Sequence, residues 1–155
     1  MENDLPLVAI ILIVLGALIV IPLYFMAVVY LIGWLSGWAR LANNFRYVGE
    51  KPAHLHRFEY IQIGFLGNYN GIINVRATKE GLFLGISLLL FRPNHPDLLI
   101  PWANIISVKS TTLTYLLGAK GFEFKVQLNS GGMLKIKIQE KCLRDDISYF
   151  QSKIA

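Results

Sequence analysis

The chain divides near residue 40 into a uniformly apolar part and a part in which apolar and polar positions alternate. Residues 5–39 contain no Asp, Glu, Lys, Arg or His. Residues 7–15 are apolar on every side of a helix, and crossing the hydrocarbon core of a bilayer takes only about 20 helical residues. Because backbone amides in lipid must be hydrogen-bonded within the segment, this pattern predicts a single N-terminal transmembrane helix.

Two other interpretations of the apolar segment fit the sequence less well. A cleaved signal peptide needs a basic start and an apolar run of about 7–15 residues, whereas acidic Glu2 and Asp4 precede this much longer run. Two spans in a hairpin around Pro22 would leave about 17 residues each, the lower limit for crossing. We therefore expect one helix that is kinked near Pro22 and that tilts or continues beyond the bilayer.

The helix is predicted to continue past the bilayer, so that residues 1–48 form an anchor with a juxtamembrane extension. A helix lying along the membrane surface as far as Asn44 is indicated by the three- and four-residue spacing of Trp38, Leu41 and Phe45. Aromatic and basic side chains predict the membrane interface at Trp34, Trp38, Arg40 and Arg46. Because acidic residues precede the helix and basic residues follow it, we expect an external N-terminus and a cytoplasmic C-terminal domain.

Small residues on the apolar helix predict a packing surface. Gly33 and Gly37 lie four residues apart, and Gly16 adds a small position nearer the N-terminus. Such residues let two membrane helices approach closely, although glycine is also common in membrane helices without such contacts. The sequence therefore leaves two interpretations, a contact with an integral membrane partner at these glycines or no specific role for them.

The charge distribution bears on the partner of the C-terminal region. All 15 Lys and Arg residues lie from Arg40 onward, with all of the 10 acidic residues except Glu2 and Asp4, so this region carries 15 − 8 = +7. Beside an anionic inner leaflet, each well-placed Lys or Arg contributes about 1 kcal/mol, which accounts for the charge without nucleic acid. The single cysteine, Cys142, excludes a disulfide scaffold and suits a reducing cytosol.

Residues 53–155 show the period of two that is typical of β-strands. Alternation is strictest over 122–128 and 134–138, around a turn at 129–132. The other strands are expected over 58–65, 72–78, 82–90, 98–100 and 105–113, with a turn at 68–71. An amphipathic C-terminal helix is predicted by apolar residues at spacings of four, three and four, Leu143, Ile147, Phe150 and Ile154. About seven strands and one capping helix predict an α+β fold, an antiparallel β-barrel like that of pleckstrin-homology (PH) domains.

Three segments carry a resemblance to a known group of proteins. They are Gly37-Trp38-Ala39-Arg40-Leu41-Ala42, Glu80-Gly81-Leu82, and residues 91–102, FRPNHPDLLIPW. Together they resemble uncharacterised bacterial membrane proteins with one N-terminal helix and a PH/GRAM-like domain, and residues 100–105 resemble the GRAM-type step into the next strand. The resemblance implies binding of proteins or phosphoinositides, without catalytic residues. The usual basic phosphoinositide pocket is not evident, because the first two strands offer only Arg57 and Arg76.

Few side chains qualify as candidate sites. Arg92 and His95 lie in a loop stiffened by two prolines, which is either a binding loop or a rigid connection whose polar residues face water. His54 and His56 would share one face of a strand, but no third ligand lies nearby in sequence, so we expect no metal site. The sequence lacks the common hydrolase, nucleotide-binding and zinc-protease motifs, so we expect no catalytic residues and no cofactor.

These observations predict a non-enzymatic, single-pass membrane protein whose PH-like cytosolic domain docks partners. An accessory or scaffolding subunit of a larger membrane complex fits an overlong helix with small residues beside a compact β domain. An adaptor that senses anionic lipid of the inner leaflet is the alternative, since the domain is basic. A membrane immunity or stress protein fits the small size but has no residue-level support.

Overall fold

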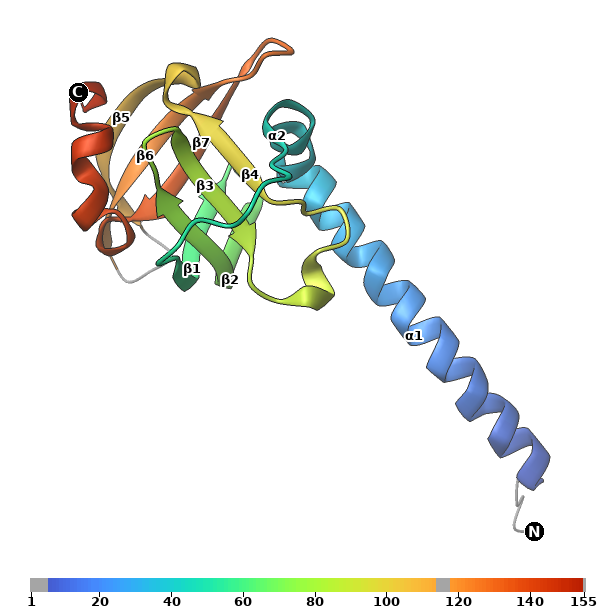
Figure 1. Cartoon of the computed structure of the whole chain (residues 1–155). Helices are drawn as coiled ribbons and strands as arrows, with labels where there is room; N and C mark the ends of the chain where they lie inside the picture. Colours follow the sequence, from blue (N-terminus) through green and yellow to red (C-terminus); the bar gives the residue numbers. More distant parts are fainter. Residues whose placement is uncertain (1–5, 114–117, 155) are drawn as a thin grey trace.

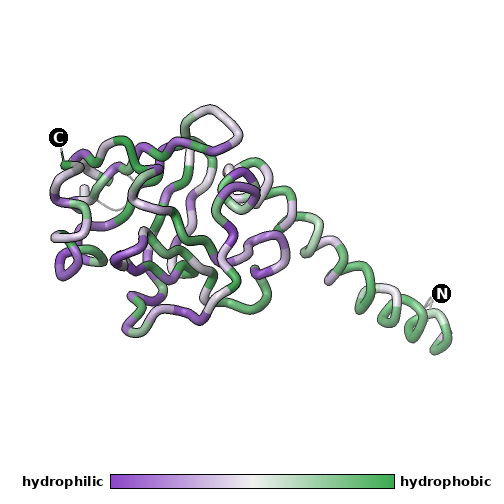
Figure 2. The backbone as a smooth tube through the Cα atoms, turned by 45° about the horizontal axis from the view of Figure 1, so that its top comes forward, coloured by the Kyte–Doolittle hydropathy of each residue, from purple (hydrophilic) through white to green (hydrophobic). Residues whose placement is uncertain are grey.

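A long N-terminal helix projects from a β-rich domain (Figure 1). The computed structural model describes residues 6–113 and 118–154. The helix, α1 (Leu7–Leu35), continues through Pro22 as one element. It is long and apolar enough to cross a membrane, and Figure 2 shows it as a largely hydrophobic stretch. Residues 7–24 expose most of their apolar side chains.

The helix ends at Ser36-Gly37, earlier than predicted. Gly37 has a φ of +90°, a left-handed conformation that glycine adopts without steric cost. A second helix, α2 (Trp38–Phe45), then turns onto the β domain. Its buried residues are Trp38, Leu41 and Phe45. The expected helix along the membrane surface is therefore wrong, because its apolar face lies in the core of the domain.

Seven strands form one curled antiparallel sheet around this core. The strands are β1 (His56–Ile63), β2 (Gly67–Ala77), β3 (Gly81–Ile86), β4 (Leu98–Pro101), β5 (Ile105–Leu113), β6 (Ala119–Gln127) and β7 (Met133–Gln139). Their order across the sheet is β4-β3-β2-β1-β7-β6-β5. The sheet curls into a half-barrel (Figure 1), which confirms the α+β class and the strand count.

Two predicted strand boundaries differ in the structure. Residues 68–71 lie inside β2 rather than in a turn, because Ile63 pairs with Gly67 and Ile61 with Tyr69. The turn falls at 64–66, which leaves Phe65 at the hairpin tip 86% exposed. The strand expected over 82–90 ends at Ile86, and a 3-10 helix, η1 (Leu89–Phe91), follows it.

The predicted C-terminal capping helix is replaced by 3-10 segments. These are η4 (Glu140–Cys142), η5 (Arg144–Tyr149) and η6 (Gln151–Lys153). The residues between them, Leu143 and Phe150, have φ values of −126° and −129° with ψ near 0°, which interrupts any continuous helix. Both side chains are nevertheless fully buried, so the segment still covers the core.

Phe150 holds the C-terminal segment against the sheet. Its ring stacks on Trp102 with centroids 5.6 Å apart and meets Phe122 and Phe124 edge-on at 5.5 Å. Such aromatic contacts add about 0.5–1.5 kcal/mol each beyond area burial. A cluster of four aromatic rings therefore compensates for the irregular backbone of this segment.

We expect Phe150→Ala to lower the free energy of unfolding of the β domain by about 3–5 kcal/mol, since it removes the ring at the centre of this cluster. Tyr149→Ala is the matched control, because Tyr149 is 39% exposed and should change stability by about 0.5 kcal/mol. Thermal unfolding followed by near-ultraviolet circular dichroism measures both. Equal losses in the two variants would contradict the packing described here.

Candidate functional site

One line of α1 contacts the β domain. Phe25, Val29 and Gly33 recur every four residues, which places them on one helix face. Phe25 meets the ring of Phe91 edge-on with centroids 5.5 Å apart, and Val29 is only 2% exposed. The last three turns of α1 therefore pack against the domain along Phe25, Val29 and Gly33, a line of contacts here called the seam. The turns of α1 before Phe25 are not part of the seam.

Gly33 and Gly37 allow the close approach of helix and domain. A Cβ atom on Gly33 would lie 2.8 Å from Cε1 of His95, and one on Gly37 would lie 2.9 Å from Cδ1 of Leu134. Nothing lies within 4 Å of the corresponding position on Gly16. Two of the three predicted helix-packing glycines therefore contact the same chain's own domain, which explains their presence without a partner helix.

The side chain of His95 lies in the buried junction between α1 and the β domain, not on the exposed surface of its loop. It is 2% exposed, so its side chain is not available to a soluble ligand. Its Nδ1 lies 3.1 Å from the Pro93 carbonyl oxygen, which must accept, so Nδ1 carries the proton. Nε2 then accepts from the hydroxyl of Tyr69 at 3.1 Å, and this oxygen accepts from Ser36 Oγ at 2.6 Å. The network ties the last turn of α1 to β2 and to the loop before β4.

Burial keeps the junction uncharged. Desolvation lowers the pKa of His95 and raises the pKa of Tyr69 to about 12. Neither ring therefore carries a charge near neutral pH. Burial likewise raises the pKa of the Cys142 thiol to about 12, so the thiol stays protonated. Within residues 6–113 and 118–154, no three His, Cys, Asp or Glu side chains are placed to hold a metal ion.

The predicted membrane interface is only partly available to lipid. Trp38 is fully buried and its indole Nε1 donates to the Pro96 carbonyl oxygen at 3.1 Å, so its placement in the interface is wrong. Trp34 is 63% exposed on α1. Two further exposed aromatic residues of that helix, Tyr24 at 72% and Tyr30 at 61%, were not predicted as interface residues. Tyrosines on an apolar helix are typical of a membrane interface, so their presence there could have indicated these two positions.

A basic cleft lies between α2 and the loop that precedes β4. This α2 cleft has a volume of about 390 Å³ and is lined by Ala39, Ala42, Asn43, Arg46, Arg92, Asn94 and Pro96. Both guanidinium groups belong to exposed residues, and neither forms an ion pair with a residue that the structure describes. The fold thus brings Arg46 and Arg92, predicted as separate features, to one site.

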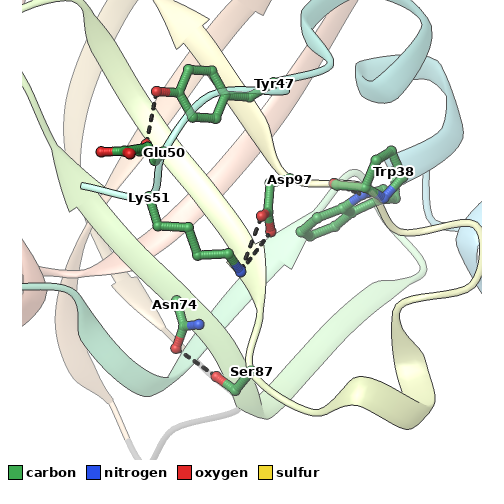
Figure 3. Close-up of polar contacts among 8 residues, drawn as sticks. Trp38, Tyr47, Glu50, Lys51, Asn74, Ser87 and Asp97 are labelled. Atoms are coloured by element: carbon green, nitrogen blue, oxygen red, sulfur yellow. Dashed lines mark hydrogen bonds and ion pairs between the residues drawn. The ribbon is translucent and has the colours of Figure 1, made fainter. Parts of the chain in front are cut away.

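Two other basic residues, Lys51 and Arg76, form ion pairs, in contrast to these two arginines. The Lys51 ammonium group lies 3.0 Å from a carboxylate oxygen of Asp97, and Figure 3 shows this pair beside Trp38. Arg76 pairs with buried Asp146 at 3.2 Å. Arg76, one of the two strand arginines considered for a phosphoinositide pocket, therefore holds the C-terminal segment instead.

A second basic site lies on the outer face of β1, β6 and β7. This sheet groove of about 490 Å³ is lined by Arg40, Gln62, Gly64, Phe65, Glu123, Lys125, Met133, Leu134, Lys135 and Lys137. Its four cations face one carboxylate, Glu123, whose oxygens lie 3.0 Å from the Lys135 ammonium group and 3.9 Å from that of Lys137, so the groove keeps an excess of positive charge. Phe65 is 86% and Met133 55% exposed. The groove therefore combines positive charge with exposed apolar side chains.

Three consecutive leucines form an exposed apolar loop beside α1. Leu88, Leu89 and Leu90, here called the leucine loop, are 41%, 75% and 64% exposed. The next residue, Phe91, is the one that contacts Phe25 of α1. The leucine loop therefore lies at the level of α1 where the seam with the domain begins.

We expect Gly33→Ala to lower the free energy of unfolding by about 1–3 kcal/mol, because the new methyl group would displace the imidazole of His95. Gly16→Ala has open space and should leave stability unchanged or raise it by up to about 1 kcal/mol. Thermal unfolding in detergent micelles compares the two. Identical midpoints would mean that the seam contributes nothing to stability.

Stability should fall as the pH drops below about 6.5, the ordinary pKa of histidine. Burial lowers the pKa of His95 in the folded state, so the unfolded chain binds a proton at a higher pH than the folded chain. Proton binding therefore stabilises the unfolded state relative to the folded state as the pH falls. His95→Gln should flatten this dependence in unfolding curves measured between about pH 7 and pH 5. The control His54→Gln, at an exposed position, should retain it. An unchanged pH dependence of stability in His95→Gln would show that His95 does not cause it.

Comparison with protein-family models and with curated proteins found no match. The function must therefore be inferred from the geometry and chemistry of these sites. Three features of the structure support such an inference: the seam along α1, the two basic sites and the leucine loop.

Proposed function

We propose that this protein is a non-enzymatic, single-pass membrane protein whose β domain docks a protein partner at the cytoplasmic surface. It would act as an accessory or scaffolding subunit of a larger complex in a bacterial inner membrane. The acidic residues before α1 and the basic residues after it support an external N-terminus. The curled seven-stranded sheet supports a PH/GRAM-like domain as the docking module.

The sheet groove is the observation that carries this proposal. Exposed Phe65 and Met133 provide apolar anchors, which dominate the energetics of many interfaces. Lys125 and Lys137 provide positive charge that steers association and selects an acidic partner. The occupant that fits is an acidic protein segment with at least one large apolar side chain.

The fixed junction makes the groove suited to a partner in the same membrane. Arg40 lines the groove and lies in α2, directly after the end of α1. The seam and the buried network at His95 hold α1 and the domain in one arrangement. A preorganised surface loses less entropy on binding than one on a flexible tether. The anionic-lipid alternative is supported by a different site, the α2 cleft. No described residue favours an immunity or stress role.

Photo-crosslinking in native membranes tests partner docking. With p-benzoylphenylalanine at Met133 of the full chain, we expect a discrete adduct with a membrane-complex subunit that carries an acidic segment. Lys125→Glu with Lys137→Glu should abolish this adduct by reversing the charge of the groove.

The matched control places the crosslinker at Val48, which is 88% exposed and does not line the groove. The same adduct from Val48, or an adduct from Met133 that survives charge reversal, would overturn the proposal.

A further inference from the structure

The free part of α1 matches the thickness of the hydrocarbon core of a bilayer. Residues 7–24 precede the seam, and 18 residues at 1.5 Å each span about 27 Å, against about 30 Å for the core. On the proposed membrane crossing, the cytoplasmic boundary of the hydrocarbon therefore falls near Phe25. Exposed Tyr24 and Tyr30 flank this level, where aromatic side chains with a polar tip are favoured.

The leucine loop lies at this same level. Phe91, which directly follows it, contacts Phe25. Leu89 and Leu90 are 75% and 64% exposed, which is unfavourable in water but favourable against acyl chains. Because the loop adjoins the apolar surface of α1, lipid that solvates the helix also reaches the leucines.

The α2 cleft adjoins the leucine loop, because the chain enters the cleft directly after Phe91. Arg92 follows Phe91 and lines this cleft together with Arg46. The side-chain amides of Asn43 and Asn94 are its other polar side chains, and no carboxylate of the described residues lines it. Guanidinium groups bind phosphate through paired, charge-assisted hydrogen bonds. The cleft residue Asn94 donates its side-chain amide to the Tyr30 carbonyl oxygen at 3.2 Å, which places the cleft more than one turn of α1 beyond Phe25. Leucines at the level of the acyl chains and arginines farther from them match the order of groups in a phospholipid.

We propose that the α2 cleft binds the phosphate group of an anionic phospholipid, with the acyl chains beside the leucine loop and α1. This site is independent of the sheet groove, since the two share no lining residue. It rests on the membrane crossing in the proposed function but not on partner docking. The adjoining leucines favour a lipid phosphate over a soluble one.

Native mass spectrometry of the full chain tests the headgroup site. The protein is released from nanodiscs that contain equal amounts of phosphatidylglycerol and phosphatidylcholine, and the lipid that remains bound is identified. We expect selective retention of phosphatidylglycerol by the wild-type protein. Arg46→Gln with Arg92→Gln should weaken it about 30-fold, as expected for two well-placed arginines.

The control Lys109→Gln with Lys120→Gln removes the same charge at exposed positions outside the cleft and should retain the lipid. Unchanged retention in the arginine variant, or an equal loss in the lysine control, would overturn the site. Displacement of the lipid by inorganic phosphate at similar concentration would overturn the assignment to a lipid. An intact crosslink from Met133 in the arginine variant would show that partner docking at the sheet groove does not depend on lipid binding in the α2 cleft.

The position of the leucine loop is tested without weakening the cleft. A nitroxide on Leu89→Cys in proteoliposomes should be more accessible to oxygen than to a water-soluble nickel complex, whereas one on Val48→Cys should show the reverse. Native Cys142 is fully buried and should remain unlabelled. Greater accessibility of position 89 to nickel would place the loop in water and overturn the proposed arrangement.

Discussion

The close packing of α1 against the β domain, made without side chains at Gly33 and Gly37, is the constraint on which the rest of the structure depends. Any side chain at Gly33 would meet His95, which in turn holds Tyr69 and, through it, Ser36. A helix joined to a domain by a free linker would leave the domain's orientation undefined. Here the backbone turn at Gly37 and a buried polar network define it.

This constraint also decides which charges remain available for binding. Much of the positive charge of the domain is compensated locally, as in the pairs Lys51–Asp97 and Lys141–Glu59. Arg46 and Arg92, by contrast, face a common cleft without a carboxylate in its lining. The proposed lipid binding would therefore depend less on the net charge than on where the fold leaves cations without a nearby carboxylate. Both basic sites lie next to α2, and the junction fixes α2 relative to α1.

Regular patterns were predictable from the sequence, and irregular backbone was not. The uninterrupted apolar run predicted α1, and strict alternation predicted the hairpin of β6 and β7 to within three residues at each strand end. The spacing of Leu143, Ile147 and Phe150 suits an α-helix as well as the 3-10 turns that form, because both bring these residues to one side. The turn at 64–66 was missed because Asn and Gly at 68–71 are typical of turns.

The candidate site depended on tertiary contacts that periodicity does not report. Trp38, Leu41 and Phe45 form an apolar face that would suit a membrane surface or a protein core equally well. His95 was a polar residue in a proline-rich loop, and only the arrival of Tyr69 from β2 explains its burial. The convergence of Arg46 and Arg92 likewise requires the loop before β4 to fold back onto α2.

The same junction relates the two proposed binding events in space. The α2 cleft and the sheet groove are both lined by residues of α2, but by different ones, Arg46 for the cleft and Arg40 for the groove. A lipid in the cleft would therefore hold the domain against the bilayer without covering the groove. Because α1 and the domain move together, each contact made at the bilayer surface restricts the directions from which a partner reaches the groove. On the proposed function, the seam from Phe25 to Gly33 would therefore convert membrane attachment into a defined docking geometry.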